Sequence, residues 1–234
     1  MQNAKRPCPT AGFERSSGPA LPGRRRFLAR LLALAGMTAG FRISGGASAS
    51  PPTRRILPPG TRAETLLEEN PAHLDIRHLE ITPPGLRGVM GQRAAPVELK
   101  DFALTVEGLV ERTIRLPYGE LTALPSVARR ALLVCPGTFS FLALWKGVRL
   151  VELLERAGRR AGARFVDIAT RPDAYGGRVE RFSLAEIGSD RLLLAWAVDG
   201  GPLPEPHGHP LRLVAEDRYG NLWVKYVEFV RLVG

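Results

Sequence analysis

Short apolar segments separated by turn residues make up the second half of the chain, with the lengths and spacings of β-strands. Apolar and polar positions alternate from Phe102 to Gly108. A continuous apolar run leads from Ala131 to Cys135, where Pro136-Gly137 breaks it. The same reasoning predicts four more strands, at residues 165–169, 192–198, 211–215 and 223–233. Strands therefore dominate the expected fold.

Helical periodicity is confined to short segments. Apolar residues recur at helical spacing over residues 150–157, and Gly158 follows as a stop signal. Ser183 with Glu186 three residues later forms a capping box for another short helix. Further short helices or turns are expected at residues 61–69 and 116–124. Because no regular β–α–β alternation is visible, the pattern predicts one α+β domain over residues 70–234, with a mixed or antiparallel sheet and short helices.

The N-terminal residues 1–49 have the pattern of an export signal. A basic stretch over residues 23–28 precedes an apolar run at 31–41 and the small residues Ala47-Ser48-Ala49. Adjacent arginines followed by Phe-Leu are typical of a twin-arginine signal, which exports a protein already folded. The alternatives are an amphipathic N-terminal helix or a membrane anchor. Proline-rich residues 50–69 are expected to form an extended tether.

The net charge of +10 would suit a nucleic-acid partner, so its distribution matters. Residues 1–49 carry eight Lys/Arg and one acid, which leaves a net charge of +3 on the rest of the chain. The remaining basic residues are scattered among acids and form no clustered stretch. The sequence therefore predicts no nucleic-acid partner.

Cys135 is the main candidate for chemistry. The chain has two cysteines, and the other, Cys8, lies in the predicted leader. A single thiol can be a buried inert residue, a reactive nucleophile or a metal ligand. A cysteine-nucleophile hydrolase would need a histidine base, for which the candidates are His73, His78, His207 and His209. No acid in the sequence is placed to orient any of them, and the residues flanking Cys135 do not choose among the three roles.

Several segments in a fixed order carry a resemblance. After Cys135 come residues 145–154, 199–204, 207–214 and 219–227. Together they resemble the molybdopterin-binding domain of the sulfite oxidase and methionine sulfoxide reductase family, over about residues 101–232. The resemblance implies a mixed α+β fold around one molybdenum, held by the dithiolene of a single pyranopterin and by one protein cysteine. That cysteine would be Cys135, and a soft thiolate suits such a metal.

The resemblance also implies contacts to the cofactor, including its terminal phosphate. By position, the cofactor-binding residues are Cys135, Thr170, His207, Arg212, Trp223, Val224 and Lys225. Arg212 offers a planar fork of donors for phosphate oxygens, and Lys225 adds a second positive charge. The alternative for both is a surface ion pair with Glu216, Asp217 or Glu228. His207 could instead be a capping or exposed histidine.

Two departures from the family pattern concern the substrate. Sulfite oxidases carry a Cys-x-Gly-Asn-Arg type sequence, whereas here Cys135 is followed by Pro-Gly-Thr-Phe, with no cation before Lys146. An anionic substrate such as sulfite is therefore less expected than a neutral sulfoxide or other oxo compound. Upstream, residues 86–91 stand where the family has a pterin-contacting segment, and are expected to offer backbone contacts alone.

The sequence thus predicts an exported, periplasmic, molybdenum-cofactor-dependent oxidoreductase that carries out oxygen-atom transfer or two-electron chemistry. It contains no Cys-x-x-Cys-His haem motif, so we expect a separate electron-transfer partner, either a membrane haem subunit or a cytochrome. The alternatives are a non-catalytic binding protein that keeps the same fold, and the cysteine hydrolase.

Overall fold

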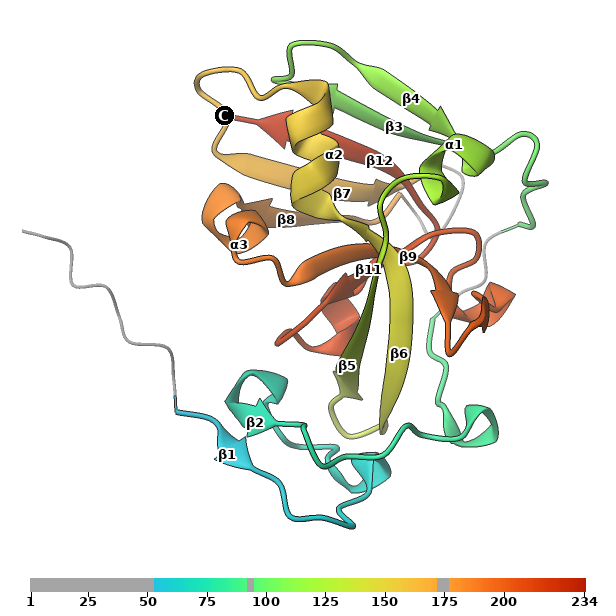
Figure 1. The fold of residues 1–234 in the computed structure, drawn as a ribbon, viewed down its shortest axis with the longest axis vertical. Helices are drawn as coiled ribbons and strands as arrows, with labels where there is room; N and C mark the ends of the chain where they lie inside the picture. Colours follow the sequence, from blue (N-terminus) through green and yellow to red (C-terminus); the bar gives the residue numbers. More distant parts are fainter. Residues whose placement is uncertain (1–52, 92–94, 172–176) are drawn as a thin grey trace, which may run out of the picture. The chain divides into compact units, whose positions relative to one another are not determined.

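The computed structural model describes residues 53–91, 95–171 and 177–234. The predicted leader lies outside these residues. The described strands build two five-stranded sheets and a two-stranded one (Figure 1). Mixed sheets and short helices confirm the expected fold class, although one main sheet was expected and two are present.

The first large sheet is antiparallel and carries the cysteine. Its strand order is β10-β9-β6-β5, with β11 also paired to β9. The strands are β5 (Val127–Cys135), β6 (Phe139–Arg149), β9 (Leu192–Val198), β10 (Gly201–Pro202) and β11 (Arg212–Ala215). β5 and β6 form a hairpin in which Cys135 lies opposite Phe139. The thiol therefore sits at the end of a rigid strand pair.

The second large sheet is mixed, with strand order β4-β3-β12-β7-β8. β3 and β12 pair in parallel, whereas the other neighbours are antiparallel. The strands are β3 (Ala103–Gly108), β4 (Ile114–Pro117), β7 (Phe165–Thr170), β8 (Val179–Ser183) and β12 (Val227–Val233). Parallel pairing joins segments more than 100 residues apart, which no local pattern in the sequence reveals.

The helices are short and lie against the sheets. They are α1 (Tyr118–Thr122), α2 (Leu150–Ala157) and α3 (Leu184–Gly188). α2 buries its apolar face against β3 of one sheet and β6 and β9 of the other, and it ends at Gly158 as predicted. The capping box predicted for Ser183 and Glu186 is present at the start of α3. None of the described helices is long and apolar enough to cross a membrane.

Among the described strands longer than two residues, three were missed by the sequence pattern. β6 is the most important, because it forms the second strand of the hairpin that carries Cys135. Most of its residues are buried on both faces, so its sequence lacks the alternation that marks a half-exposed strand. β4 and β8 are short edge strands of the mixed sheet. The expected strand 223–233 begins only at Val227, since Tyr226 adopts a positive φ of 55°.

The predicted extended tether is wrong where the structure describes it, from residue 53. β1 (Arg55–Ile56) pairs with β2 (Leu74–Asp75). Ala63–Thr65 form a 3-10 helix within the short helix or turn expected at residues 61–69. Leu57 and Leu66 are buried in a cluster that includes Leu132 and Leu142 on β5 and β6. Prolines suggested an extended linker, but the apolar residues between them cover the outer face of the hairpin.

Removing a side chain from this cluster tests whether the N-terminal segment is part of the folded domain. Leu57 is 1% exposed, so Leu57→Ala should lower the free energy of unfolding by about 2–5 kcal/mol. The neighbouring Ile56 is 54% exposed, so Ile56→Ala should change it by less than about 0.5 kcal/mol. Urea denaturation of both variants gives the comparison, and equal stabilities would mean that the segment does not pack as described.

Candidate functional site

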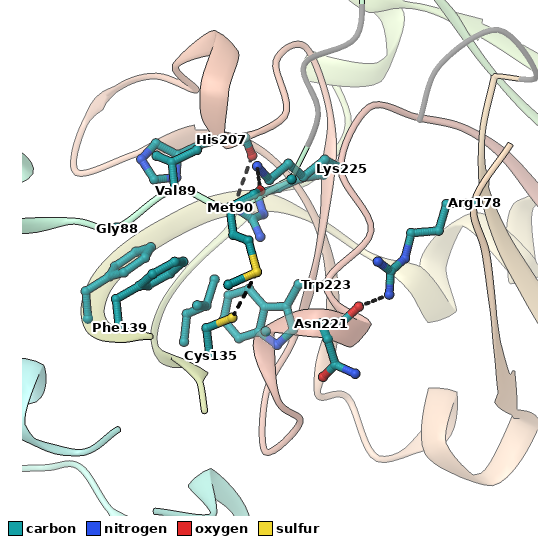
Figure 2. Close-up of a pocket in the computed structure, with 15 residues that line it drawn as sticks. Gly88, Val89, Met90, Cys135, Phe139, Arg178, His207, Asn221, Trp223 and Lys225 are labelled. Carbon is teal, nitrogen blue, oxygen red and sulfur yellow. Dashed lines mark hydrogen bonds between the residues drawn. The ribbon is translucent and has the colours of Figure 1, made fainter. Parts of the chain in front are cut away.

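A pocket opens where β5 ends, and residues from five separate parts of the chain line it (Figure 2). It holds about 650 Å³ of empty space, counting the space at its mouth. Its walls are Gly88, Val89, Met90, Gly91, Leu133, Cys135, Phe139, Phe141, Arg178, His207, Arg212, Gly220, Asn221, Trp223 and Lys225. A mainly apolar lining with a few polar groups is typical of small-molecule sites.

Cys135 contributes the thiol of this pocket. It is the last residue of β5, and a tight turn follows in which the Thr138 amide donates to the Cys135 carbonyl at 3.0 Å. Gly137 has a φ of 68°, which the turn requires and which favours glycine. Cys135 is 9% exposed and forms no disulfide. Its sulfur lies 3.8 Å from the sulfur of Met90.

Arg212 lies in the wall with its charge buried. The residue is 1% exposed, and its guanidinium carbon lies 4.9 Å from the centre of the Trp145 ring and 5.5 Å from that of Trp223. One guanidinium nitrogen donates to the His207 carbonyl at 3.0 Å. Stacking on two indoles and bonding to a carbonyl offset part of the cost of burying the charge. The arrangement fixes a cation at the pocket wall.

Lys225 brings a second cation to the same pocket. Its ammonium donates to the carbonyls of Met90 at 2.8 Å and Pro206 at 2.7 Å. Gly208 allows this packing, because a Cβ there would lie 2.9 Å from the Lys225 Cβ. Lys225 therefore joins two loops that are far apart in the sequence.

His207 lies between these cations and the aromatic wall. Its ring packs edge-to-face on Phe141, with 5.7 Å between the ring centres. Burial, and then the positive charges of Arg212, Lys225 and Arg87, lower the pKa of the His207 imidazole from 6.5 to about 4. The imidazole is therefore neutral at neutral pH. It neither caps a helix through its side chain nor lies exposed, as the alternative would require.

The structure brings most of the predicted residues together, but not all. Cys135, His207, Arg212, Trp223 and Lys225 line the pocket. Val224 and Thr170 are not among the residues that line it. The side chain of Val224 is fully buried, and its carbonyl accepts from the Leu213 amide. Thr170 is also buried, and its amide donates to the Arg178 carbonyl at 3.0 Å. Thr170 thus supports a pocket residue instead of lining the pocket.

Arg178 and Asn221 are pocket residues that sequence reasoning missed. The Arg178 guanidinium donates to the Asn221 carbonyl and, at 2.6 Å, to the Glu180 carboxylate. Its Nε is buried and has no hydrogen-bond partner among the described residues. A glycine-rich stretch ahead of an arginine is a weak sequence signal, and nothing local shows that β8 starts beside the pocket.

The acids proposed as partners for Arg212 and Lys225 pair with other arginines. Glu216 lies 3.5 Å from Arg129 and Glu228 lies 3.9 Å from Arg171, while Asp217 pairs with Arg54 and Arg191. The burial of Arg212 is also inconsistent with a surface ion pair.

Of the four candidate bases for a cysteine hydrolase, His207 lines the pocket with Cys135, whereas the other three histidines do not. His209 makes a contact of 3.1 Å with the Leu203 carbonyl through Nδ1, and His73 belongs to a 3-10 turn near the N-terminal segment. Within the described ranges, no three His, Cys, Asp or Glu side chains are grouped so that they could hold a metal ion.

Comparison with known proteins identifies the family. A family model described as an oxidoreductase molybdopterin binding domain matches residues 92–233, and the chain belongs to this family. The catalytic subunit MsrP of the protein-methionine-sulfoxide reductase of Gluconobacter oxydans is 30% identical over 146 residues, which cover 56% of this chain and 47% of that protein. Nitrate reductase [NADH] 1 of Arabidopsis thaliana is 29% identical over 183 residues, covering 65% of this chain and 20% of the enzyme.

Two further similarities are consistent with this result. The uncharacterized oxidoreductase YuiH of Bacillus subtilis is 28% identical over 138 residues, covering 57% of this chain and 68% of that protein. The sulfane dehydrogenase SoxCD of Paracoccus pantotrophus superposes with a TM-score of 0.56 at 23% identity, over 60% of this chain and 40% of that chain, which shows a shared fold. The chain spans about half the length of the Gluconobacter relative and a fifth of the plant enzyme.

Membership of the family makes molybdopterin the cofactor of this oxidoreductase domain. The pocket fits such a group chemically. A thiol lies in its wall, aromatic side chains line it, and the cations Arg178, Arg212 and Lys225 surround it. The buried Arg178 Nε is a donor suited to an anionic oxygen.

The lowered pKa of His207 predicts how stability depends on pH. Between pH 6.5 and about 4, the unfolded chain binds a proton at His207 that the folded chain does not, so the His207 contribution to stability falls as pH falls through this window. His207→Gln cannot take up that proton and should lose less stability than the wild type between pH 7 and pH 4. Urea denaturation at both pH values gives this difference.

An NMR titration of the His207 ring checks the same point directly. The midpoint should lie near pH 4. A midpoint at or above 6.5 would show that the imidazole is not buried among these cations as described.

Proposed function

We propose that this chain is an exported molybdenum-cofactor-dependent oxidoreductase whose Cys135 thiolate is the protein ligand of the metal. The observation that carries the proposal is the position of Cys135 in a pocket that also holds Arg178, Arg212 and Lys225. A soft thiolate is a suitable donor for such a metal, and coordination keeps the thiol deprotonated. The cofactor, when bound, supplies oxygen-atom transfer or two-electron redox chemistry.

The protein residues supply anchoring and shape. Arg212, Lys225 and Arg178 would hold the anionic end of the pterin, because each places a positive charge in the wall. His207 is neutral, so its ring can donate one hydrogen bond and accept another without adding charge. Trp223 holds its ring in place by donating to the Arg218 carbonyl at 3.0 Å, which keeps the stack on Arg212 aligned.

The surroundings of Cys135 support a neutral oxo substrate, such as a sulfoxide. Met90, Phe139 and Phe141 line the pocket, and the sulfur of Met90 touches that of Cys135. The turn after Cys135 contains no cation, since it consists of Pro-Gly-Thr. A sulfite-like anion beside this turn would lose hydration and gain no charged partner from the turn, because Arg178, Arg212 and Lys225 would hold the pterin.

The leader in the sequence and the similarity to a relative named as a catalytic subunit support the rest of the proposal. The twin-arginine pattern in residues 1–49 is consistent with export of a folded, cofactor-loaded protein to the periplasm. Electrons would then pass to or from a separate partner, such as a membrane haem subunit or a cytochrome. The rival function is a non-catalytic binding protein, and the contact between Met90 and Cys135, which covers the thiol, is the observation that favours it.

Metal content tests the role of Cys135. Protein made in a host that synthesises the cofactor should contain about one molybdenum per chain, and Cys135→Ser should retain less than about a tenth of that, because the thiolate ligand is lost. Cys8→Ser, in the predicted leader, is the matched control and should keep the metal. Elemental analysis of the three purified proteins decides the matter, and equal metal in wild type and Cys135→Ser would contradict the assignment.

Turnover separates the enzyme from the binding protein. The loaded protein should reduce a neutral sulfoxide with an artificial electron donor, or oxidise the corresponding product with an acceptor, faster than it converts sulfite. A loaded protein that binds one molybdenum and converts none of these compounds in either direction would favour the binding protein.

A further inference from the structure

The segment Pro83–Gly91, here called the strap, crosses one side of the pocket. It follows the buried Thr82, whose amide donates to the Leu142 carbonyl at 2.9 Å and whose hydroxyl accepts from the Leu142 amide at 3.1 Å. Gly88 then lies flat on the ring of Phe139, since a Cβ there would be 2.1 Å from the Phe139 Cγ. The chain is therefore attached to β6 at two points, just before the strap at Thr82 and within it at Gly88.

Arg87, the cation of the strap, is turned into the protein. Its side chain is 5% exposed, and it pairs with Asp199. Its Nε donates to the Thr82 carbonyl at 2.9 Å, and its guanidinium carbon lies 5.9 Å from the centre of the Phe141 ring. Asp199 is itself held by the Leu144 amide at 2.8 Å. Arg87 is not among the residues that line the pocket, so the strap presents apolar side chains to it.

The far end of the strap places Met90 over the thiol. The Met90 carbonyl accepts from Lys225 at 2.8 Å, and its thioether sulfur lies 3.8 Å from the Cys135 sulfur (Figure 2). Met90 is 47% exposed, whereas Cys135 is 9% exposed. The methionine side chain therefore stands between the solvent and the thiol. An unbranched thioether has three rotatable bonds, so it can move aside without moving the strap.

We propose that Met90 controls access to the Cys135 sulfur, as a movable cover held in place by the Arg87–Asp199 pair and the Lys225–Met90 hydrogen bond. In the cofactor-free protein the cover limits which reagents reach the thiol. In the loaded protein the same side chain limits the size of the substrate that approaches the site. The second statement rests on the proposed function, whereas the first is a property of the chain alone.

Alkylation of Cys135 measures the cover without any cofactor. The full chain is made in a host that does not synthesise molybdopterin and is treated with iodoacetamide, and mass spectrometry follows the peptide that contains Cys135. Thiol reactivity depends on access, so Met90→Ala should raise the alkylation rate by about tenfold. Met90→Leu fills a similar volume and should stay within about twofold of the wild-type rate. Cys8 in the same chain is the internal reference.

A control variant on the strap distinguishes the loss of the Met90 side chain over the thiol from a general loosening of the strap. Leu86 is 52% exposed and does not line the pocket, so Leu86→Ala should leave the Cys135 rate unchanged. Asp199→Asn weakens the pair with Arg87 and should raise the rate, by less than Met90→Ala does. The proposal is overturned if Met90→Ala alkylates at the wild-type rate, or if Leu86→Ala or Met90→Leu accelerates alkylation as much as Met90→Ala.

Turnover by the loaded enzyme tests the second statement. For a bulky sulfoxide, Met90→Ala should lower KM or raise kcat/KM by several-fold relative to a small sulfoxide, because the cover no longer restricts size. An unchanged ratio between the two substrates would overturn the role in substrate selection. If the protein binds no molybdenum, the proposed function fails while the alkylation result still decides whether Met90 covers the thiol.

Discussion

The buried charge of Arg212 is the constraint on which the pocket depends. A guanidinium at 1% exposure is costly unless polar and aromatic groups surround it. Trp145 on β6 and Trp223 supply two ring faces, and the His207 carbonyl supplies an acceptor. His207 and Trp223 lie near Arg212 in the sequence, whereas Trp145 lies far from it, so satisfying the charge draws β6 and the C-terminal stretch 207–223 together. The same charge helps keep the nearby imidazole neutral, and it prepares the wall for an anionic cofactor group.

The rigid hairpin of β5 and β6 fixes the position of Cys135 in the site. Nine paired positions end at Cys135 opposite Phe139, and the tight turn that follows leaves the thiol at the edge of the sheet. Loops from elsewhere in the chain then close around this edge. Functional residues commonly lie on loops and strand ends that packed sheets hold in position. Here it explains how one thiol faces a pocket while remaining mostly buried.

Family membership and substrate choice rest on different parts of the molecule. The family match covers the two large sheets and the cationic wall, which hold what its members share. The strap lies just before the matched residues, and it differs in character from that wall. It turns its arginine inward to Asp199 and presents Met90 to the thiol. A pocket built in this way has anchoring charges on one side and a soft, apolar surface beside Cys135.

The sequence by itself determined the strand-rich core, α2 with its stop at Gly158, the capping box of α3, and the residues Cys135, His207, Arg212, Trp223 and Lys225 that the pocket brings together. Periodicity reports neighbours two to four positions apart, and an ordered set of motifs reports a family. Only the tertiary structure decided that β6 is a strand, that residues 57–66 pack on the hairpin, and that Thr170 and Val224 lie outside the pocket lining. Above all, it placed Met90 on the thiol of a residue 45 positions away and Arg178 in the cationic wall. Such contacts follow from the packing of distant segments, which no local pattern encodes.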